Sequence, residues 1–241
     1  MNGTSFVGLV QNAALLLAVT FIFNTVATKV WMKRVSFVQV LFGLVLGTIG
    51  IIVMLTPWTF RQGIIFDTRS VLLGIAGLFF GSVPTFIAMA MTAALRFYQG
   101  GAGVLPGIIV IFTSGTIGIT WRHLRRHPIA QISWRELYLF GIVIHVTMLA
   151  AMLTLPWETA LRVLTNIALP IILIYPAGTA LLGLIITIQL RRELVAEALT
   201  RSEEKFRKTF YTSPDSSNIN RLEDGRYVSI NPGFTRIMGY K

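Results

Sequence analysis

Cysteine is absent from this chain of 241 residues, which excludes disulfide bridges and thiolate metal sites. Charged residues are scarce as well, because Asp, Glu, Lys and Arg make up only 13% of the chain, about half of the fraction usual in water-soluble domains. Hydrophobic residues reach 54%. This composition predicts an integral membrane protein, and the length allows one membrane domain followed by a short soluble part.

The sequence also lacks the residue groupings that enzymes use. It contains no paired carboxylates, no nucleophile with a neighbouring base and no phosphate-binding glycine loop. His123 and His127 stand four residues apart, but they lie among arginines with no carboxylate nearby, so a metal site is not expected there. We therefore expect no catalytic residue, no metal and no cofactor in these 241 residues, and any catalytic part would lie beyond Lys241.

Acidic residues are few relative to basic ones, which gives the chain a net charge of +11. The basic residues stand in short stretches beside apolar runs rather than on one face interleaved with aromatic residues. This pattern is typical of topology signals and of contacts with lipid headgroups. The expected partners therefore include the lipid bilayer and exclude nucleic acid.

The first residues, Met1–Phe6, carry no lysine or arginine, whereas a cleaved export signal begins with a positive segment. The apolar run Phe6–Ala27 that follows is long enough to span a membrane and is succeeded at once by Lys29, Lys33 and Arg34. We expect this run to stay in the membrane with its C-terminal end in the cytoplasm.

Apolar runs of about 20 residues, enough to cross a ~30 Å hydrocarbon core, occur five times in the chain. They are Phe6–Ala27, Val35–Leu55, Ala102–Trp121, Leu137–Leu155 and Ile167–Gln189. A further segment, Ser70–Leu95, is ambiguous because Gly77, Gly81 and Pro84 interrupt it. It could cross once, which gives six spans and two cytoplasmic termini, or it could enter and return, which gives five spans and an outer N-terminus.

Two observations favour the hairpin that enters and returns. The five-span topology leaves four arginines of the short loops outside and places seven basic residues inside, namely Lys29, Lys33, Arg34, Arg122, Arg125, Arg126 and Arg135. The six-span topology divides the same residues six to five, so the positive-inside rule favours five spans. The two arms, Ser70–Phe80 and Pro84–Leu95, would each be only ~17 Å of helix, too short to cross comfortably. We predict five spans plus a helical hairpin, with the N-terminus outside and the C-terminus in the cytoplasm.

Arg69 and Arg96 bracket this uncharged segment, and arginine in a membrane is costly, roughly 2.5–3.5 kcal/mol at a bilayer centre. With a hairpin, both guanidinium groups would lie on the outer side, beside Asp67 and the small residues Gly100 and Gly101. Two converging guanidinium groups form a fork suited to a carboxylate or phosphate. The alternative is that each arginine extends to lipid headgroups or pairs locally, Arg69 with Asp67. The candidate ligand-binding residues are Asp67, Arg69, Arg96, Gly100 and Gly101.

His145 is the one histidine expected inside a span. A neutral, hydrogen-bonded packing histidine is the favoured interpretation, and an ionisable functional residue is the alternative.

The composition changes abruptly after Gln189. Arg191–Lys208 is rich in helix formers and in charges of both signs, and its leucines give a partial apolar seam. A short parallel coiled coil between two copies and a single solvated helix are both compatible with it.

The last residues predict a strand pair and a helix. Asp224-Gly225 predicts a turn between strands Asn218–Leu222 and Arg226–Ile230. Asn231-Pro232 can open a helix over Gly233–Met238.

Two parts of the chain are similar to known families. The run E-E-K-F-R-K-x-F-x-x-S-P-D from Glu203, with D-G-R-Y-V-S-I-N-P-G-F-T-R-I-M-G-Y from Asp224, resembles the first half of a PAS domain entered through a signalling helix. The membrane part resembles the five-transmembrane receptor domain of the LytS type. The residues that carry this second resemblance are Asp67-x-Arg69, the G-L-F-F-G of Gly77–Gly81, and Arg96 with Gly100-Gly101.

These resemblances imply an all-α polytopic membrane domain (1–190), a signalling helix (191–207) and part of an α/β PAS domain (208–241). Such receptors sit at the N-terminus of bacterial histidine kinases and diguanylate cyclases, and some are thought to sense small carboxylates. They imply a homodimeric sensor module in the bacterial plasma membrane that binds a small anionic ligand from outside and signals to an output domain, a histidine kinase or else a diguanylate cyclase. A more distant similarity to vitamin uptake transporters leaves a substrate-binding transport subunit as the alternative.

Overall fold

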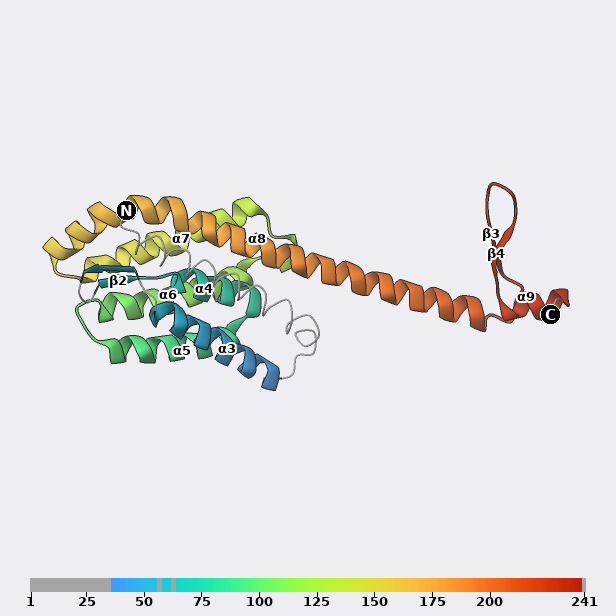
Figure 1. Cartoon of the computed structure of the whole chain (residues 1–241), viewed down its shortest axis with the longest axis horizontal. Coiled ribbons are helices and arrows are strands. Elements are labelled where there is room, and N and C mark those ends of the chain that lie inside the picture. The colour runs from blue at the N-terminus through green and yellow to red at the C-terminus, as the bar shows by residue number, and fades with distance from the viewer. Residues whose placement is uncertain (1–35, 56–57, 62–63, 240–241) are drawn as a thin grey trace. The chain divides into compact units, whose positions relative to one another are not determined.

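The computed structural model describes residues 36–55, 58–61 and 64–239. The predicted span Phe6–Ala27 lies outside these residues. The chain divides into two compact units, Met1–Leu190 and Arg191–Lys241 (Figure 1).

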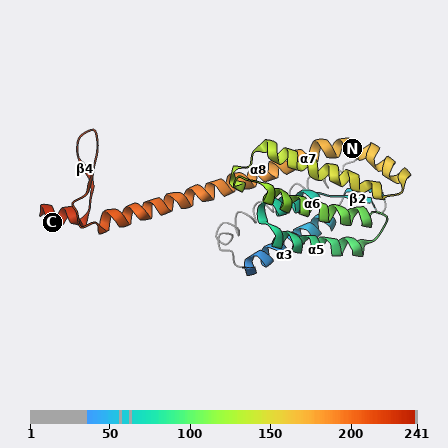
Figure 2. The ribbon, with the colours of Figure 1, turned by 180° about the vertical axis from the view of Figure 1, so that it is seen from behind.

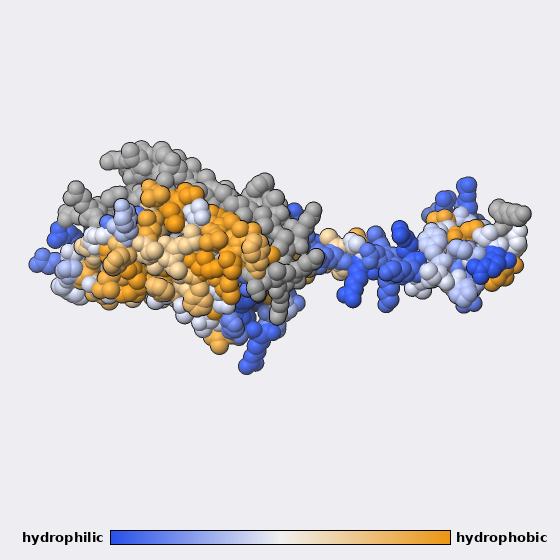
Figure 3. Space-filling view, turned by 90° about the horizontal axis from the view of Figure 1, so that it is seen from below, coloured by the Kyte–Doolittle hydropathy of each residue, from blue (hydrophilic) through white to orange (hydrophobic). Residues whose placement is uncertain are grey.

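Four helices of the described residues are long and apolar enough to cross a membrane. They are α3 (Ser36–Leu55), α6 (Val104–Leu124), α7 (Trp134–Ala151) with the 3₁₀ turn η4 (Met152–Thr154), and α8 (Trp157–Thr212). The first three match predicted apolar runs to within a few residues. Helix α8 begins ten residues before the predicted Ile167 and runs without interruption through Pro170, Pro176 and the predicted signalling helix to Thr212. Apolar side chains cover much of the face of the first unit in Figure 3, as expected for a surface against lipid.

The interrupted segment folds as a helical hairpin. Its first arm is α4 (Arg69–Ile75) continued by the π-helix η2 (Ala76–Phe80), and its second arm is α5 (Ser82–Gln99). The chain turns at Gly81, whose φ of +87° is readily adopted only by glycine. Pro84 does not interrupt α5, because it lies in the first turn, where its missing N–H would have had no helical partner. The second arm is therefore longer at both ends than the predicted Pro84–Leu95.

The two arms run antiparallel, so that Arg69 and Arg96 meet at one end of the hairpin and Gly81 lies at the other. Helix α6 packs between α5 and α7, as Figure 2 shows. Glycines allow the close approach: a Cβ on Gly77 would lie only 2.6 Å from the carbonyl oxygen of Gly115. Large side chains such as Phe79 and Phe140 fill the remaining space between the helices.

Arg122, near the end of α6, forms hydrogen bonds to the backbone at the turn of the hairpin. Its Nη1 donates to the carbonyl oxygens of Leu78, at 3.0 Å, and Phe79, at 2.8 Å, which lie in the last turn of η2. Carbonyls in the last turn of a helix have no partner within the helix, so a guanidinium that reaches two of them stabilises the turn.

We expect Arg122→Met, which keeps the chain length but removes the donors, to lower the free energy of unfolding by about 1–3 kcal/mol. Thermal unfolding of the protein in detergent measures this loss. Arg126→Met, a change at an exposed position in the following loop, is the matched control and should leave the midpoint unchanged. Equal midpoints for the two variants would contradict the stabilising role of Arg122.

A short hairpin that the sequence did not predict precedes α4. Strands β1 (Trp58–Arg61) and β2 (Ile64–Phe66) pair antiparallel with an irregular register. The strand β2 ends immediately before Asp67, so Asp67 lies between this hairpin and the start of α4.

In the second unit, the tail of α8 is followed by β3 (Asn218–Asn220), β4 (Tyr227–Ile230) and α9 (Pro232–Met238). The predicted strand pair and turn are confirmed, with Gly225 at φ +70°, although β3 ends two residues before the predicted Leu222 and β4 begins one residue after Arg226. The predicted helix begins one residue earlier than expected. Asn231 organises the segment: its Oδ1 accepts from the N–H groups of Ser217 and Phe234, and its Nδ2 donates to the carbonyl of Asp215. The PAS assignment of these residues stays a prediction.

Candidate functional site

Asp67 and Arg69 form a local ion pair at the start of α4. The backbone N–H of Arg69 donates to Asp67 Oδ1 at 3.0 Å, and Arg69 Nε lies 3.4 Å from the same oxygen. Both residues are buried, at 3% and 6% exposure. The local pairing of Arg69 with Asp67, given above as the alternative to ligand binding, is therefore present. Neither side chain reaches the surface, as the other form of that alternative, a headgroup contact, would require.

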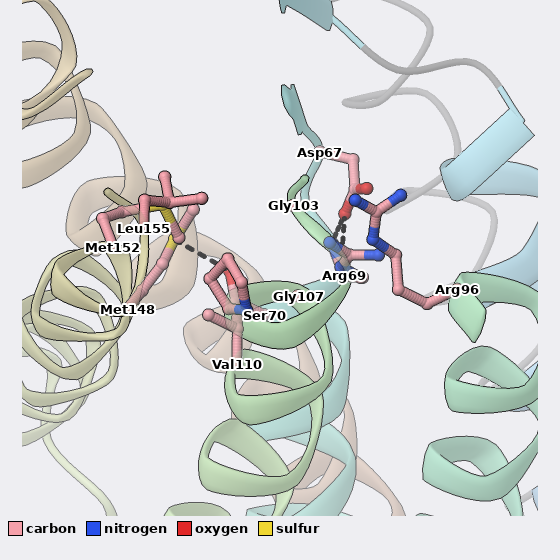
Figure 4. A pocket seen from close by; sticks show the side chains of 11 residues that line it. Asp67, Arg69, Ser70, Arg96, Gly103, Gly107, Val110, Met148, Met152 and Leu155 are labelled. Carbon is pink, nitrogen blue, oxygen red and sulfur yellow. Dashed lines mark hydrogen bonds and ion pairs between the residues drawn. The ribbon is translucent and has the colours of Figure 1, made fainter. Parts of the chain in front are cut away.

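Arg96 approaches the same place from the last turn of α5 and is only 2% exposed. Its Nη1 donates to Gln99 Oε1 at 3.4 Å. The start of α6 makes room for it, because a Cβ on Gly107 would lie 2.7 Å from Arg96 Nε. Figure 4 shows the two guanidinium groups beside Asp67, one from α4 and one from α5.

These residues form one wall of a small cavity of about 20 Å³. The facing wall is apolar and comes from α6, α7, η4 and the residue that follows, with Val110, Met148, Met152 and Leu155 (Figure 4). A volume of this size holds about one water molecule. A carboxylate of even two carbons could enter only if lining side chains moved.

The buried charges of this cluster do not balance. Two guanidinium groups face one carboxylate, and arginine keeps its charge in proteins. Burial raises the pKa of the Asp67 carboxyl above its ordinary value, while the Arg69 charge, the Arg69 N–H and the Arg96 charge oppose that shift. The cluster therefore carries an excess positive charge whether or not Asp67 is ionised.

Several polar atoms of the cluster also have no hydrogen-bond partner among the described residues. They are Asp67 Oδ2, Thr68 Oγ1 and Arg69 Nη1. Unpaired polar atoms are uncommon in protein interiors and call for a water, an ion or a ligand. Arg69 Nη1 can only donate and an ionised Asp67 Oδ2 can only accept, so the cluster offers groups of both kinds to a water or a polar ligand.

The structure thus brings Asp67, Arg69 and Arg96 together as the sequence predicts. Gly100 and Gly101 do not line the cavity; they form the turn from α5 to α6, with φ values of +65° and +87°. Sequence reasoning did not include the other lining residues, which are Ser70, Gly103, Pro106, Gly107, Val110, Met148, Met152 and Leu155. Two patterns in the sequence could have indicated some of these residues, because Gly103/Gly107 and Met148/Met152 are each four residues apart, the spacing of one helix face.

His145 lies behind the cavity, fully buried on α7. Its Nδ1 bonds the carbonyl oxygen of Gly141 at 2.7 Å, and its Nε2 lies 3.4 Å from Ser70 Oγ. This is the hydrogen-bonded packing arrangement that the sequence favoured. No cluster of His, Asp and Glu that could hold a metal ion occurs in residues 36–55, 58–61 and 64–239.

Among the curated proteins that are similar to this chain in sequence are sensor histidine kinases. The chain is 28% identical over 133 residues to the sensor histidine kinase/phosphatase LytS of Staphylococcus aureus, with the same values for strains Mu50, N315 and NCTC 8325. The match covers 53% of this chain and 22% of the relatives, so the chain corresponds to about a fifth of their length. No solved structure matches.

A family model described as the 5TMR of 5TMR-LYT matches residues 20–189, which include every residue that lines the cavity. This match confirms the LytS-type resemblance, and the chain belongs to the 5TMR-LYT family of multi-pass membrane receptor domains.

Proposed function

We propose that this receptor domain senses a small carboxylate, which binds from the extracytoplasmic side between Arg69 and Arg96. The observation that carries the proposal is the pair of buried guanidinium groups that lie beside a single carboxylate, which pairs with Arg69, at the edge of a cavity. A carboxylate ligand would neutralise the excess charge and could accept from Arg69 Nη1. The apolar wall of Met148, Met152 and Leu155 suits the carbon end of such a ligand.

The distribution of basic residues supports an outward-facing cavity. Helix α6 begins at Val104 beside the cavity, and its far end carries Arg122, with Arg125 and Arg126 just beyond. Short loops rich in arginine face the cytoplasm, so the cavity end would face outside. The turn of the hairpin contacts Arg122 at this far end, so the hairpin extends along α6 from the cavity towards the cytoplasmic side.

The ligand would act through α8, the one helix that belongs to both units. Binding can shift this helix only if the ligand has different affinities for two arrangements of the receptor. Beyond the membrane domain, α8 exposes Leu194, Leu199 and Phe206, a seam that suits a parallel second copy. The output would be a histidine kinase, as in the LytS relatives, or a diguanylate cyclase, reached through the PAS-like segment.

The direct test is a titration of the protein in lipid nanodiscs with acetate, pyruvate, succinate and inorganic phosphate. We expect saturable binding of at least one carboxylate with a Kd of about 1 mM or tighter. Acetamide, which is isosteric with acetate but uncharged, is the matched control and should not bind. Absence of binding by all three carboxylates would contradict the proposal, and binding of phosphate alone would redirect it to another anion. Uptake of the bound carboxylate into vesicles would instead support the transport alternative.

A further inference from the structure

A line of contacts leads from the wall of the cavity to α8. Ser70 follows Arg69 directly and lines the cavity. Its Oγ lies 3.4 Å from His145 Nε2 on α7. The ring of His145 also packs against the ring of Tyr175 on α8, with centroids 5.1 Å apart and planes inclined at 55°.

The hydrogen bonds of His145 have a fixed direction. A carbonyl oxygen can only accept, so Nδ1, which lies 2.7 Å from the Gly141 carbonyl, carries a proton. In the neutral ring Nε2 is then the acceptor, and the Ser70 hydroxyl is the donor beside it, shared with Met148 Sδ at 3.9 Å. The imidazole is thereby held between α4 and α7 in one orientation, with its ring against α8.

The segment of α8 at this level is suited to bending. Pro170 and Pro176 lie inside the helix and remove two of its backbone hydrogen bonds. Pro176 packs directly on α7, because a Cβ on Gly141 would lie only 2.8 Å from the Pro176 Cα. Kinks in long helices occur most often at such prolines.

We propose that Ser70, His145 and Tyr175 are the positioning residues that couple the Arg69 site to the bend of α8. A displacement of Arg69 moves its neighbour Ser70, which reorients the His145 ring and changes its packing against Tyr175. The inference rests on the proposed function for its biological meaning, because there the ligand displaces Arg69. The coupling itself requires no ligand.

The experiment measures a distance within the membrane domain. Because the chain has no cysteine, Arg126→Cys and Ile188→Cys introduce two unique sites for spin labels, both of them exposed. The label distance is compared in nanodiscs with and without Arg69→Gln, which perturbs the cavity without any ligand. We expect Arg69→Gln to shift the mean distance by about 1–2 Å, the scale of helix shifts in switching proteins.

The same measurement is then repeated in three variants, each of which changes one residue of the contacts between the cavity and α8. Tyr175→Phe keeps the ring contact and should preserve the shift, whereas Tyr175→Leu and Ser70→Ala should reduce it to the uncertainty of the measurement. Ser70→Ala removes a single oxygen and carries the test if Tyr175→Leu does not fold. A shift that persists in Ser70→Ala, or no shift in the parent protein, would overturn the inference. Failure of carboxylates to bind would contradict only the proposed function, because no ligand enters this experiment.

Discussion

Replacing Arg96 with alanine should weaken carboxylate binding by about 30-fold or more, because truncating one partner of a buried, hydrogen-bonded charge pair typically costs about 2–5 kcal/mol. The Arg96 side chain lies in the cavity wall at 2% exposure, so bulk water cannot readily take its place. The same loss is expected for Arg69→Ala. Calorimetric or fluorescence titration in nanodiscs, with whichever of acetate, pyruvate or succinate binds the parent protein, measures the change.

Two controls separate charge from geometry at this site. Arg96→Lys keeps the positive charge but cannot form the planar two-pronged contact, so we expect an intermediate loss of about tenfold. Arg162→Ala removes an exposed arginine of α8 that does not line the cavity, and it should leave the Kd unchanged. Unchanged affinity in both Arg69→Ala and Arg96→Ala would place the anion elsewhere.

Gly77→Ala should destabilise the membrane domain strongly, by about 3 kcal/mol, because the added methyl group overpacks a contact between two backbones. The Cβ would lie 2.6 Å from both the Gly115 carbonyl oxygen and the backbone nitrogen of Ile119. Neither atom can swing aside as the end of a long side chain could, so η2 and α6 would have to separate. A lower thermal midpoint and poorer recovery of monodisperse protein in detergent are the expected results.

The matched control for this change is Gly178→Ala on α8. A Cβ on Gly178 would meet no atom within 4 Å, and alanine favours a helix interior over glycine by about 1 kcal/mol. We therefore expect Gly178→Ala to keep or slightly raise the midpoint. Equal effects of the two substitutions would mean that the close packing of η2 on α6 does not limit stability.

Much of the membrane domain could be predicted from the sequence because its signals are local. Runs of apolar residues locate α3, α6 and α7, and the high energy of arginine beside hydrocarbon identifies Arg69 and Arg96. The turn at Gly81 also follows from residue type, although Pro84 nearby suggested a longer interruption than the structure has.

The rest of the site depends on how helices are rotated against one another, and no local pattern specifies that rotation. Met148 of α7 and Met152 of η4 line the cavity only because these two elements pack against α4 and α6. Gly107 matters because Arg96 of another helix lies against it. Ser70 could not be distinguished by sequence from any other small polar residue of a helix that lies in a membrane.

The small volume of the cavity would affect both the observed affinity for a ligand and the rate at which the ligand binds. If the ligand enters only a minor, expanded conformation, its observed affinity equals the intrinsic affinity reduced by the population of that conformation. The association rate would then level off at high ligand concentration, at the rate of opening rather than at the rate of diffusion. The packing of Met148, Met152 and Leu155, which controls how readily the cavity expands, would set the detection threshold without any contact to the anionic group.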